Sequence, residues 1–276
     1  MLVFVYGTLL RGMCRFPALS HAEPMGPALA QGKLYDLGDY PGLRPGSDVV
    51  VGEIYRVDAR TLDRLDGIED YYPDCPESSL YLRRPIQVRL LADGRRLQAE
   101  TYLYASPLPE SRRIADGDYR RHVLEKQGGP QWMAAYGSNS SRQRLEARVG
   151  PVGERVIGCL PDFEMRLNTT DPSRAQVFAN IRFSPGARCP AILQRLSVQQ
   201  MNTLDHYEGT PEHYLRVALP FLPDGEIQPQ LVQLWIAHPD TLAEGIAASE
   251  TYLAHIRQGY QEMGLVLDAA SAIRPD

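Results

Sequence analysis

A long-range internal repeat constrains this chain of 276 residues more than any other feature. Residues 62–69 align without a gap on residues 201–208, and the pairs Leu65/Leu204, Asp66/Asp205 and Glu69/Glu208 are identical. The segment Tyr6-Gly7-Thr8 likewise returns as Tyr136-Gly137-Ser138, and Tyr81-Leu82-Arg83 returns as Tyr214-Leu215-Arg216. A period of about 130 residues is too long for a solenoid of short repeats, so the sequence predicts a duplicated domain.

The length of the chain agrees with two domains, because each half of roughly 130 residues is large enough to bury its own core. The Gly/Pro cluster 128–130 has complete elements on both sides and is the expected linker. We therefore expect one domain over residues 1–127 and a second over residues 131–276.

Apolar periodicity and turn residues predict alternating strands and helices in each half. Residues 11–30 are interpreted as a loop with one helical turn, and Tyr40-Pro41-Gly42 as a turn. In the first half, strands are expected over 2–5, 31–37, 49–57, 81–91 and 96–104, with helices over 59–66 and 118–126. In the second half, strands are expected over 157–163, over 189–196 and up to Ala237, with a closing helix from Ser249.

Each copy of the Tyr-Gly-Ser/Thr segment follows a short apolar strand. Glycine there permits backbone angles that a side chain would forbid, so we expect strain if Gly7 or Gly137 becomes alanine. Consecutive amides at such a turn can form a concave cradle for a carboxylate or a developing oxyanion. The sequence thus predicts an anion-binding loop, and predicts it twice.

Glu69 and Glu208 recur three residues after the Leu-Asp pair, although the residues between have changed. A lone glutamate is usually a solvated surface carboxylate, and only its repetition favours a role in a site. Aromatic neighbours, Tyr71 and Tyr72 in one half and Tyr207 and Tyr214 in the other, are expected to desolvate each carboxyl and raise its pKa. Each glutamate is then a candidate general base.

Composition and charge exclude several classes of protein. Hydrophobic residues at 43% and charged residues at 23% are ordinary globular values, and a net charge of −5 without a basic run argues against nucleic acid or an anionic membrane as partner. The apolar start, residues 1–10, has no basic leader and is too short to span a bilayer. Isolated cysteines at 14, 75, 159 and 189 show no metal or dithiol spacing, so we expect a cytoplasmic protein with reduced thiols and without a metal.

Both halves resemble the gamma-glutamyl cyclotransferase superfamily, which includes gamma-glutamylamine cyclotransferase and the AIG2-like proteins. The resemblance rests on the Tyr-Gly-Thr/Ser-Leu/Asn loop, the Leu-Asp-x-x-Glu helix end and the downstream Tyr-x-Arg strand. The first half resembles the gamma-glutamylamine/AIG2-like branch and the second the branch that reads Tyr-Gly-Ser-Asn. The implied fold is α+β: two tandem domains, each a small mixed β-barrel with flanking helices.

The resemblance also implies release of 5-oxoproline from a gamma-glutamyl compound, without a cofactor. The α-amine of the substrate attacks its own γ-carbonyl, so the enzyme supplies a proton carrier and an anion cradle. Glu69 and Glu208 are the implied catalytic residues. The implied substrate-binding residues are Tyr6, Gly7, Thr8 and Leu9 in the first half and Tyr136, Gly137, Ser138 and Asn139 in the second.

A different class of function remains open: a non-catalytic or half-catalytic binding protein for a gamma-glutamyl metabolite or a protein partner. Retention of glutamate at both positions argues against a pure binder, yet the segment after Glu208 is shorter than its counterpart, so one site is a candidate for lost turnover. The sequence leaves open the leaving amine, the arrangement of the halves and the oligomeric state, including a monomer in which the halves form a pseudo-dimer.

Overall fold

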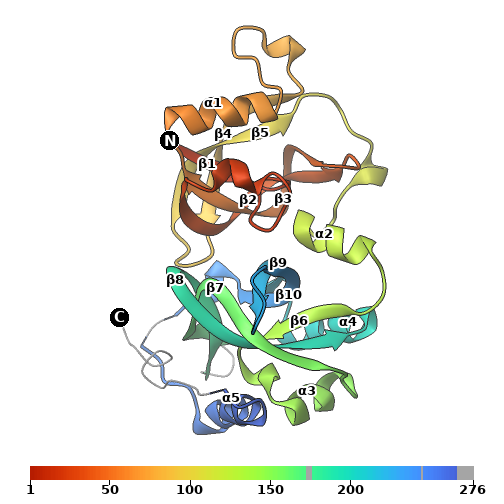
Figure 1. Cartoon of the computed structure of the whole chain (residues 1–276), viewed down its shortest axis with the longest axis vertical. Helices are drawn as coiled ribbons and strands as arrows, with labels where there is room; N and C mark the ends of the chain where they lie inside the picture. Colours follow the sequence, from red (N-terminus) through yellow and green to blue (C-terminus); the bar gives the residue numbers. More distant parts are fainter. Residues whose placement is uncertain (172–175, 244, 266–276) are drawn as a thin grey trace. The chain divides into compact units, whose positions relative to one another are not determined.

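The computed structural model, drawn in Figure 1, describes residues 1–171, 176–243 and 245–265. The chain divides into two compact units, Met1–Val123 and Leu124–Asp276. The division falls within helix α2 (Tyr119–Lys126), shortly before the expected linker at residues 128–130. Each unit contains one copy of the repeated segments.

The first unit is a closed five-stranded barrel with the strand order β1-β3-β2-β4-β5. β1 pairs antiparallel with β3 and parallel with β5, which makes the sheet mixed. The strands are β1 (Leu2–Val5), β2 (Glu23–Asp36), β3 (Pro41–Arg56), β4 (Tyr81–Leu90) and β5 (Arg96–Tyr104). Helix α1 (Ala59–Ile68), α2 and the short 3-10 turns η1 (Phe16–Leu19), η2 (Pro76–Ser78) and η3 (Glu110–Arg112) complete the unit.

The second unit is also a closed barrel, with the order β10-β6-β8-β7-β9. Its strands are β6 (Gln131–Ala135), β7 (Arg155–Asp171), β8 (Gln176–Leu196), β9 (Tyr214–Pro223) and β10 (Gln230–Ala237). Its helices are α3 (Arg142–Val149), α4 (Val198–Glu208) and α5 (Glu250–Glu262), with 3-10 turns η4 (Ser138–Ser140) and η5 (Pro239–Thr241).

The two barrels have the same topology. When β6 to β10 replace β1 to β5 one for one, the cyclic strand order is identical, and the parallel pair β6/β10 takes the place of β1/β5. The predicted α+β fold of two small mixed barrels is therefore confirmed, and two copies of one topology are what a tandem duplication produces.

Strand β1 lies at the centre of the first unit because both of its faces are buried. Phe4 belongs to a core cluster with residues of β2, β3 and β4, whereas Val3 and Val5 pack with Leu62 and Leu65 of α1. Side chains alternate between the two faces of a strand, so a continuous apolar run buries both. The turn that follows β1 is thus attached to a strand that is buried on both faces.

Three local expectations were wrong, and one helix was missed. The loop expected over 11–30 ends at residue 22, because β2 begins at Glu23 and accommodates its prolines beside a register shift. Tyr40-Pro41-Gly42 leads directly into β3, and α1 runs on to Ile68 instead of ending at Gly67. Helix α3, capped by Ser141, was not expected, because its charged sequence shows little apolar periodicity.

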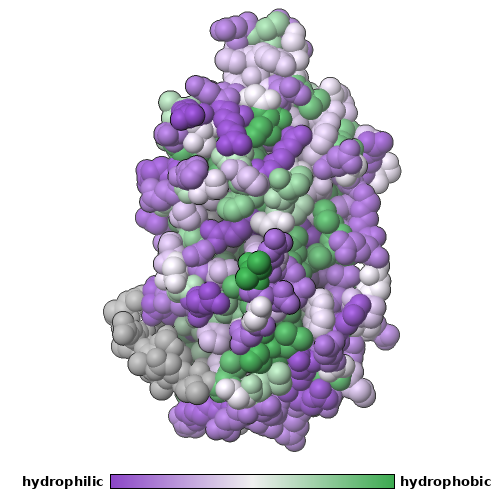
Figure 2. Space-filling view, in the orientation of Figure 1, coloured by the Kyte–Doolittle hydropathy of each residue, from purple (hydrophilic) through white to green (hydrophobic). Residues whose placement is uncertain are grey.

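The face shown in Figure 2 is mostly hydrophilic, with small apolar areas between the polar ones. The exposed large apolar side chains come from separate segments: Met1, Val49, Tyr72, Val198, Tyr207, Ile227 and Ile246. Within the described ranges, no helix is both long enough and apolar enough to cross a bilayer.

Candidate active site

The turn after β1 presents backbone donors at the wall of a pocket. The Leu10 amide donates to the Gly7 carbonyl at 3.0 Å, and the Arg15 amide donates to the Thr8 carbonyl at 2.9 Å. In the described part of the chain, the amides of Gly7, Thr8 and Leu9 donate no hydrogen bond. These three residues line the pocket, so their amides can serve a bound anion.

Gly7 is required for space rather than for unusual backbone angles. Neither Gly7 nor Gly137 is among the glycines with positive φ, so the expectation of backbone strain was wrong at both turns. A Cβ at Gly7 would lie 2.6 Å from Cγ and 2.9 Å from Cδ of Pro41, which is too close for either atom. Glycine lets the turn pack directly on the start of β3.

The far end of the turn is tied to a buried ion pair. The Arg11 amide donates to Glu53 Oε2 at 3.0 Å, and Arg120 of α2 donates to Glu53 Oε1 at 2.7 Å. Burial alone opposes ionisation, but the Arg120 charge and the hydrogen bonds from Arg11 and Tyr55 hold the pKa of Glu53 below its usual value. The side chain of Arg120 is fully buried, so this pair fixes the turn against the barrel.

Helix α1 places Glu69 opposite this turn. Asp58 caps the helix by accepting from the Thr61 amide at 2.8 Å, and Leu62 and Leu65 bury its inner face. Glu69 is the first residue after the helix, and Asp70 behind it adopts a left-handed conformation with φ of +48°. A left-handed residue commonly ends a helix, so the backbone turns away here and leaves the Glu69 side chain at the helix end.

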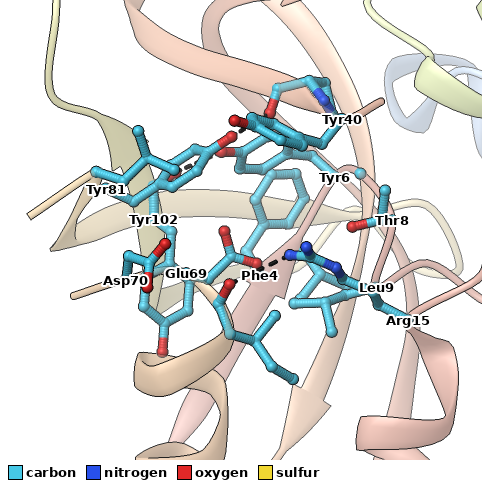
Figure 3. Close-up of a pocket in the computed structure, with 15 residues that line it drawn as sticks. Phe4, Tyr6, Thr8, Leu9, Arg15, Tyr40, Glu69, Asp70, Tyr81 and Tyr102 are labelled. Carbon is cyan, nitrogen blue, oxygen red and sulfur yellow. Dashed lines mark hydrogen bonds between the residues drawn. The ribbon is translucent and has the colours of Figure 1, made fainter. Parts of the chain in front are cut away.

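The turn and the glutamate line the same cavity, of about 110 Å³. Figure 3 shows the carboxyl of Glu69 between the tyrosine rings of the pocket and the guanidinium of Arg15. Tyr6 and Tyr81 are buried members of this wall, whereas Tyr71 and Tyr72, expected to cover the carboxyl, do not line the pocket. All the predicted residues of the first site, Tyr6, Gly7, Thr8, Leu9 and Glu69, thus lie together.

Glu69 has the electrostatic character of a proton carrier. Burial raises the pKa of its carboxyl to about 7; the Arg15 charge opposes this rise and the Asp70 charge adds to it. Among the described residues no group donates a hydrogen bond to the Glu69 carboxyl or forms an ion pair with it. The carboxyl is therefore available to a substrate, and near neutral pH it is present in both protonation states.

The repeated Asp and Arg residues form a clamp that holds the helix end. Asp66 accepts from Arg83 at 2.5 Å and from the Tyr102 hydroxyl at 2.7 Å, which joins α1 to β4 and β5. Two further tyrosines brace the pocket: the Tyr6 hydroxyl donates to the Tyr102 carbonyl at 2.5 Å, and the Tyr81 hydroxyl donates to Pro41 at 2.7 Å. These hydroxyls are engaged with backbone, so the tyrosines shape the pocket.

The second unit repeats the clamp with different partners. Asp205 accepts from the Trp235 indole at 3.0 Å and lies 3.4 Å from Arg216. The Tyr136 hydroxyl donates to the Trp235 carbonyl at 2.5 Å, and the Tyr214 hydroxyl donates to Ala179 at 2.7 Å. The internal repeat therefore preserves a hydrogen-bonded frame around each pocket.

The second pocket also brings its predicted residues together. Its wall contains Tyr136, Gly137, Ser138, Asn139 and Glu208. The cavity has a volume of about 40 Å³, less than half that of the first. Helix α5 contributes Tyr252 to this wall, where α2 contributes no residue to the first pocket.

Glu208 differs from Glu69 in its contacts. Arg148 of α3 donates to Glu208 Oε1 at 2.8 Å, and the Asn139 amide group donates to the same oxygen at 2.9 Å. Arg148 also donates to Oδ1 of the Asn139 side chain at 2.9 Å, so Arg148, Asn139 and Glu208 form a closed triangle of hydrogen bonds. Oε1 of Glu208 is thus occupied by protein donors rather than offered to a substrate.

Sequence reasoning missed Arg15, Tyr81, Arg148 and the Asp66 clamp. Arg15 and Arg148 lie in segments where the two halves do not align, so the internal comparison gave no signal for them. Tyr81 and Asp66 do recur as Tyr214 and Asp205, and this repetition could have indicated that they belong to the site. In the ranges that the structure covers, no three His, Cys, Asp or Glu side chains gather as a metal site requires.

Comparison with known proteins matches residues 3–121 to the family model described as gamma-glutamyl cyclotransferase, AIG2-like. The Escherichia coli gamma-glutamylcyclotransferase family protein YtfP is 32% identical over 120 residues, which is 43% of this chain and 96% of that protein. The chain belongs to the gamma-glutamyl cyclotransferase family.

Two other similarities show how much of the chain resembles known proteins. A gamma-glutamylcyclotransferase homologue from Vibrio cholerae is 48% identical over 71 residues, 25% of this chain and 62% of that protein. The crystal structure of YkqA from Bacillus subtilis matches 95% of this chain and 91% of its own with a TM-score of 0.72 at 19% identity, a likeness that shows the fold alone. The family model thus covers the first unit, and the fold covers both.

Proposed function

We propose that the first unit is a gamma-glutamyl cyclotransferase that releases 5-oxoproline from a gamma-glutamyl compound, with Glu69 as general acid and base. One observation carries the proposal: a partly buried carboxyl with a pKa near 7 lies in the same pocket as three backbone amides that donate no hydrogen bond within the described chain. The two domains are proposed as residues 1–127 and 131–276.

The chemistry follows from these two features. Glu69 takes a proton from the α-ammonium of the substrate, and the freed amine attacks the γ-carbonyl carbon to close a five-membered ring. The new C–N bond pushes the carbonyl electrons onto oxygen, and the amides of Gly7, Thr8 and Leu9 stabilise this oxyanion. The intermediate collapses by cleavage of the original C–N bond as Glu69 returns its proton to the leaving nitrogen. The ring nitrogen then gives up its second proton, which the departing amine takes up as an ammonium group, so the products are 5-oxoproline and the protonated amine.

A carboxyl with a pKa of about 7 suits both halves of this cycle, because it is a competent base and a competent acid at neutral pH. The nucleophile belongs to the substrate, so no serine or cysteine nucleophile is needed. The apolar tyrosine wall limits water around the carboxyl, which strengthens its interaction with the ammonium group.

The second unit is proposed to retain the fold without this reaction. The support is the triangle formed by Glu208, Arg148 and Asn139, together with the smaller cavity. A binding role for this pocket is the alternative function.

The test is assay of 5-oxoproline after incubation with gamma-glutamyl amino acids, gamma-glutamyl-ε-lysine and glutathione. We expect Glu69→Gln to lower kcat by about 100-fold or more, since a positioned acid–base group contributes about that much. Glu208→Gln is the matched control and is expected to retain activity. Binding without turnover in the unaltered protein, or full activity in Glu69→Gln, would refute the assignment.

A further inference from the structure

Arg15 is a charged group at the open side of the first pocket that the proton-transfer chemistry does not use. Its backbone amide is bonded to the Thr8 carbonyl at 2.9 Å, which ties it to the anion-binding turn. Its guanidinium donates to the Ile68 carbonyl at 3.2 Å, immediately before Glu69. The side chain is solvent exposed yet lines the pocket, so it lies where the pocket meets water.

Arg15 forms no ion pair with a carboxylate in the part of the chain that the structure describes, although its charge opposes the rise in the pKa of Glu69. A guanidinium has five N–H donors, and a single one is used here. The hydrogen bond to Ile68 holds the group beside Glu69 without an ion pair between them. Arg148 in the second unit differs, because its guanidinium forms an ion pair with Glu208 at 2.8 Å.

The direction of the reaction identifies which part of a substrate meets Arg15. The glutamyl part must reach both the amides of the turn and Glu69, against the buried rings of Tyr6 and Tyr81. The leaving amine is the other end of the scissile bond and departs to solvent, so it lies toward the exposed side of the pocket. An exposed cation at that side fits an anionic group on the leaving amine.

We propose that Arg15 binds the carboxylate of a leaving amino acid, so that the first site acts on gamma-glutamyl amino acids or peptides in preference to gamma-glutamyl derivatives of simple amines. This inference rests on the proposed cyclotransferase function of the same site. It assigns Arg15 a role in substrate selection that is separate from the proton transfer by Glu69.

The experiment compares gamma-glutamyl-alanine with gamma-glutamyl-alaninamide, in which a neutral carboxamide replaces the carboxylate of the leaving group. The unaltered protein is expected to show at least about a tenfold higher kcat/KM for the carboxylate, mostly through KM, and Arg15→Gln is expected to erase that preference. Arg60→Gln, on the exposed side of α1, is the matched control and should retain the preference.

Inhibition by 5-oxoproline separates two roles for Arg15, because this product keeps the glutamyl carboxylate and lacks the leaving group. We expect Arg15→Gln to leave the inhibition constant within about twofold, since no contact with the product is lost. Weaker 5-oxoproline binding with equal losses on both substrates would overturn the proposal and place Arg15 on the glutamyl end. Equal rates on both substrates in the unaltered protein would also overturn it.

Calorimetric titration of both compounds into Glu69→Gln measures their binding affinity without turnover, so it tests recognition by Arg15 separately from the proposed reaction. If the unaltered protein releases no 5-oxoproline, the cyclotransferase assignment fails. A binding preference for the carboxylate that disappears on adding Arg15→Gln would then still support recognition by Arg15, and the same affinity for both compounds would refute it.

Discussion

Replacing Glu69 with glutamine should make the first unit more resistant to unfolding as the pH rises, although the side chain belongs to the proposed catalytic machinery. Burial raises the pKa of this carboxyl from 4.5 to about 7 in the folded protein. The folded state therefore holds the proton more tightly than the unfolded chain does. Glutamine is neutral at every pH and carries no such dependence.

The sign and size of the effect follow from proton linkage. Below about pH 4.5 the carboxyl is protonated in both states, and above about pH 7 it is ionised in both, at a cost to the folded state. The difference of about 2.5 between 7 and 4.5 corresponds to about 3 kcal/mol at 1.36 kcal/mol per pH unit. Partial exposure of the side chain makes that figure an upper value, so we expect about 1–2 kcal/mol.

The comparison that matters is therefore wild type against Glu69→Gln at pH 5 and again at pH 8.5. Both tryptophans, Trp132 and Trp235, belong to the second unit, so their fluorescence does not report on the first. Urea unfolding followed by hydrogen exchange of peptides from β1 and β3 isolates the first unit. The stability of Glu69→Gln relative to wild type should rise by about 1–2 kcal/mol between the two pH values.

Glu208→Gln is the matched control, and it should behave in the opposite way. It removes the negative charge that Arg148, whose side chain is 17% exposed, contacts at 2.8 Å, and leaves that guanidinium beside a neutral amide. Tryptophan fluorescence should then show the second unit destabilised by about 1–3 kcal/mol at neutral pH. If the difference between Glu69→Gln and wild type is the same at pH 5 and pH 8.5, the carboxyl is not desolvated and the proposed general base loses its physical basis.

Three further changes test the surroundings of Glu69. Asp70→Asn removes a charge that raises the pKa of Glu69, so the acid limb of a kcat/KM profile, expected to rise through about pH 7, should move to lower pH. Gly7→Ala should lower kcat/KM at least about tenfold, because the added Cβ would lie 2.6 Å from Pro41 and must displace the turn. Gly67→Ala meets nothing within 4 Å, so thermal unfolding should show a gain of about 0.5–1 kcal/mol with unchanged activity.

The sequence was sufficient to predict the duplication, because the two halves carry the same segments in the same order, whereas the barrel was predicted from the family resemblance. The sequence also predicted that the turn after β1 and the glutamate after α1 belong to one site, and in the structure Gly7 and Glu69 line the same pocket. The internal comparison worked because the positions that recur are those that shape the pocket.

The sequence could not predict which side chains from the segments that do not align between the halves would line each pocket. Arg15 and Arg148 lie in loop or helix segments without an aligned counterpart in the other half, and charged residues there are usually solvated. The role of Gly7 was also misassigned, since contact with Pro41 depends on how β3 begins. Each of these errors concerns a contact between segments far apart in sequence, which periodicity does not report.

The two glutamates show why retention of a residue in both copies does not establish retention of its chemistry. The clamp around Asp66 and that around Asp205 are equivalent, because both hold a helix end against the strands of a barrel. A glutamate at that helix end then lies near the pocket in either copy, whatever surrounds it. We propose that a neighbouring guanidinium decides how each glutamate is used. Arg15 donates to a backbone carbonyl and leaves the Glu69 carboxyl without a hydrogen bond, whereas Arg148 donates directly to Glu208 and forms an ion pair with it. The proposed difference in turnover between the units therefore depends on the arginine contacts and not on the glutamates, which are identical.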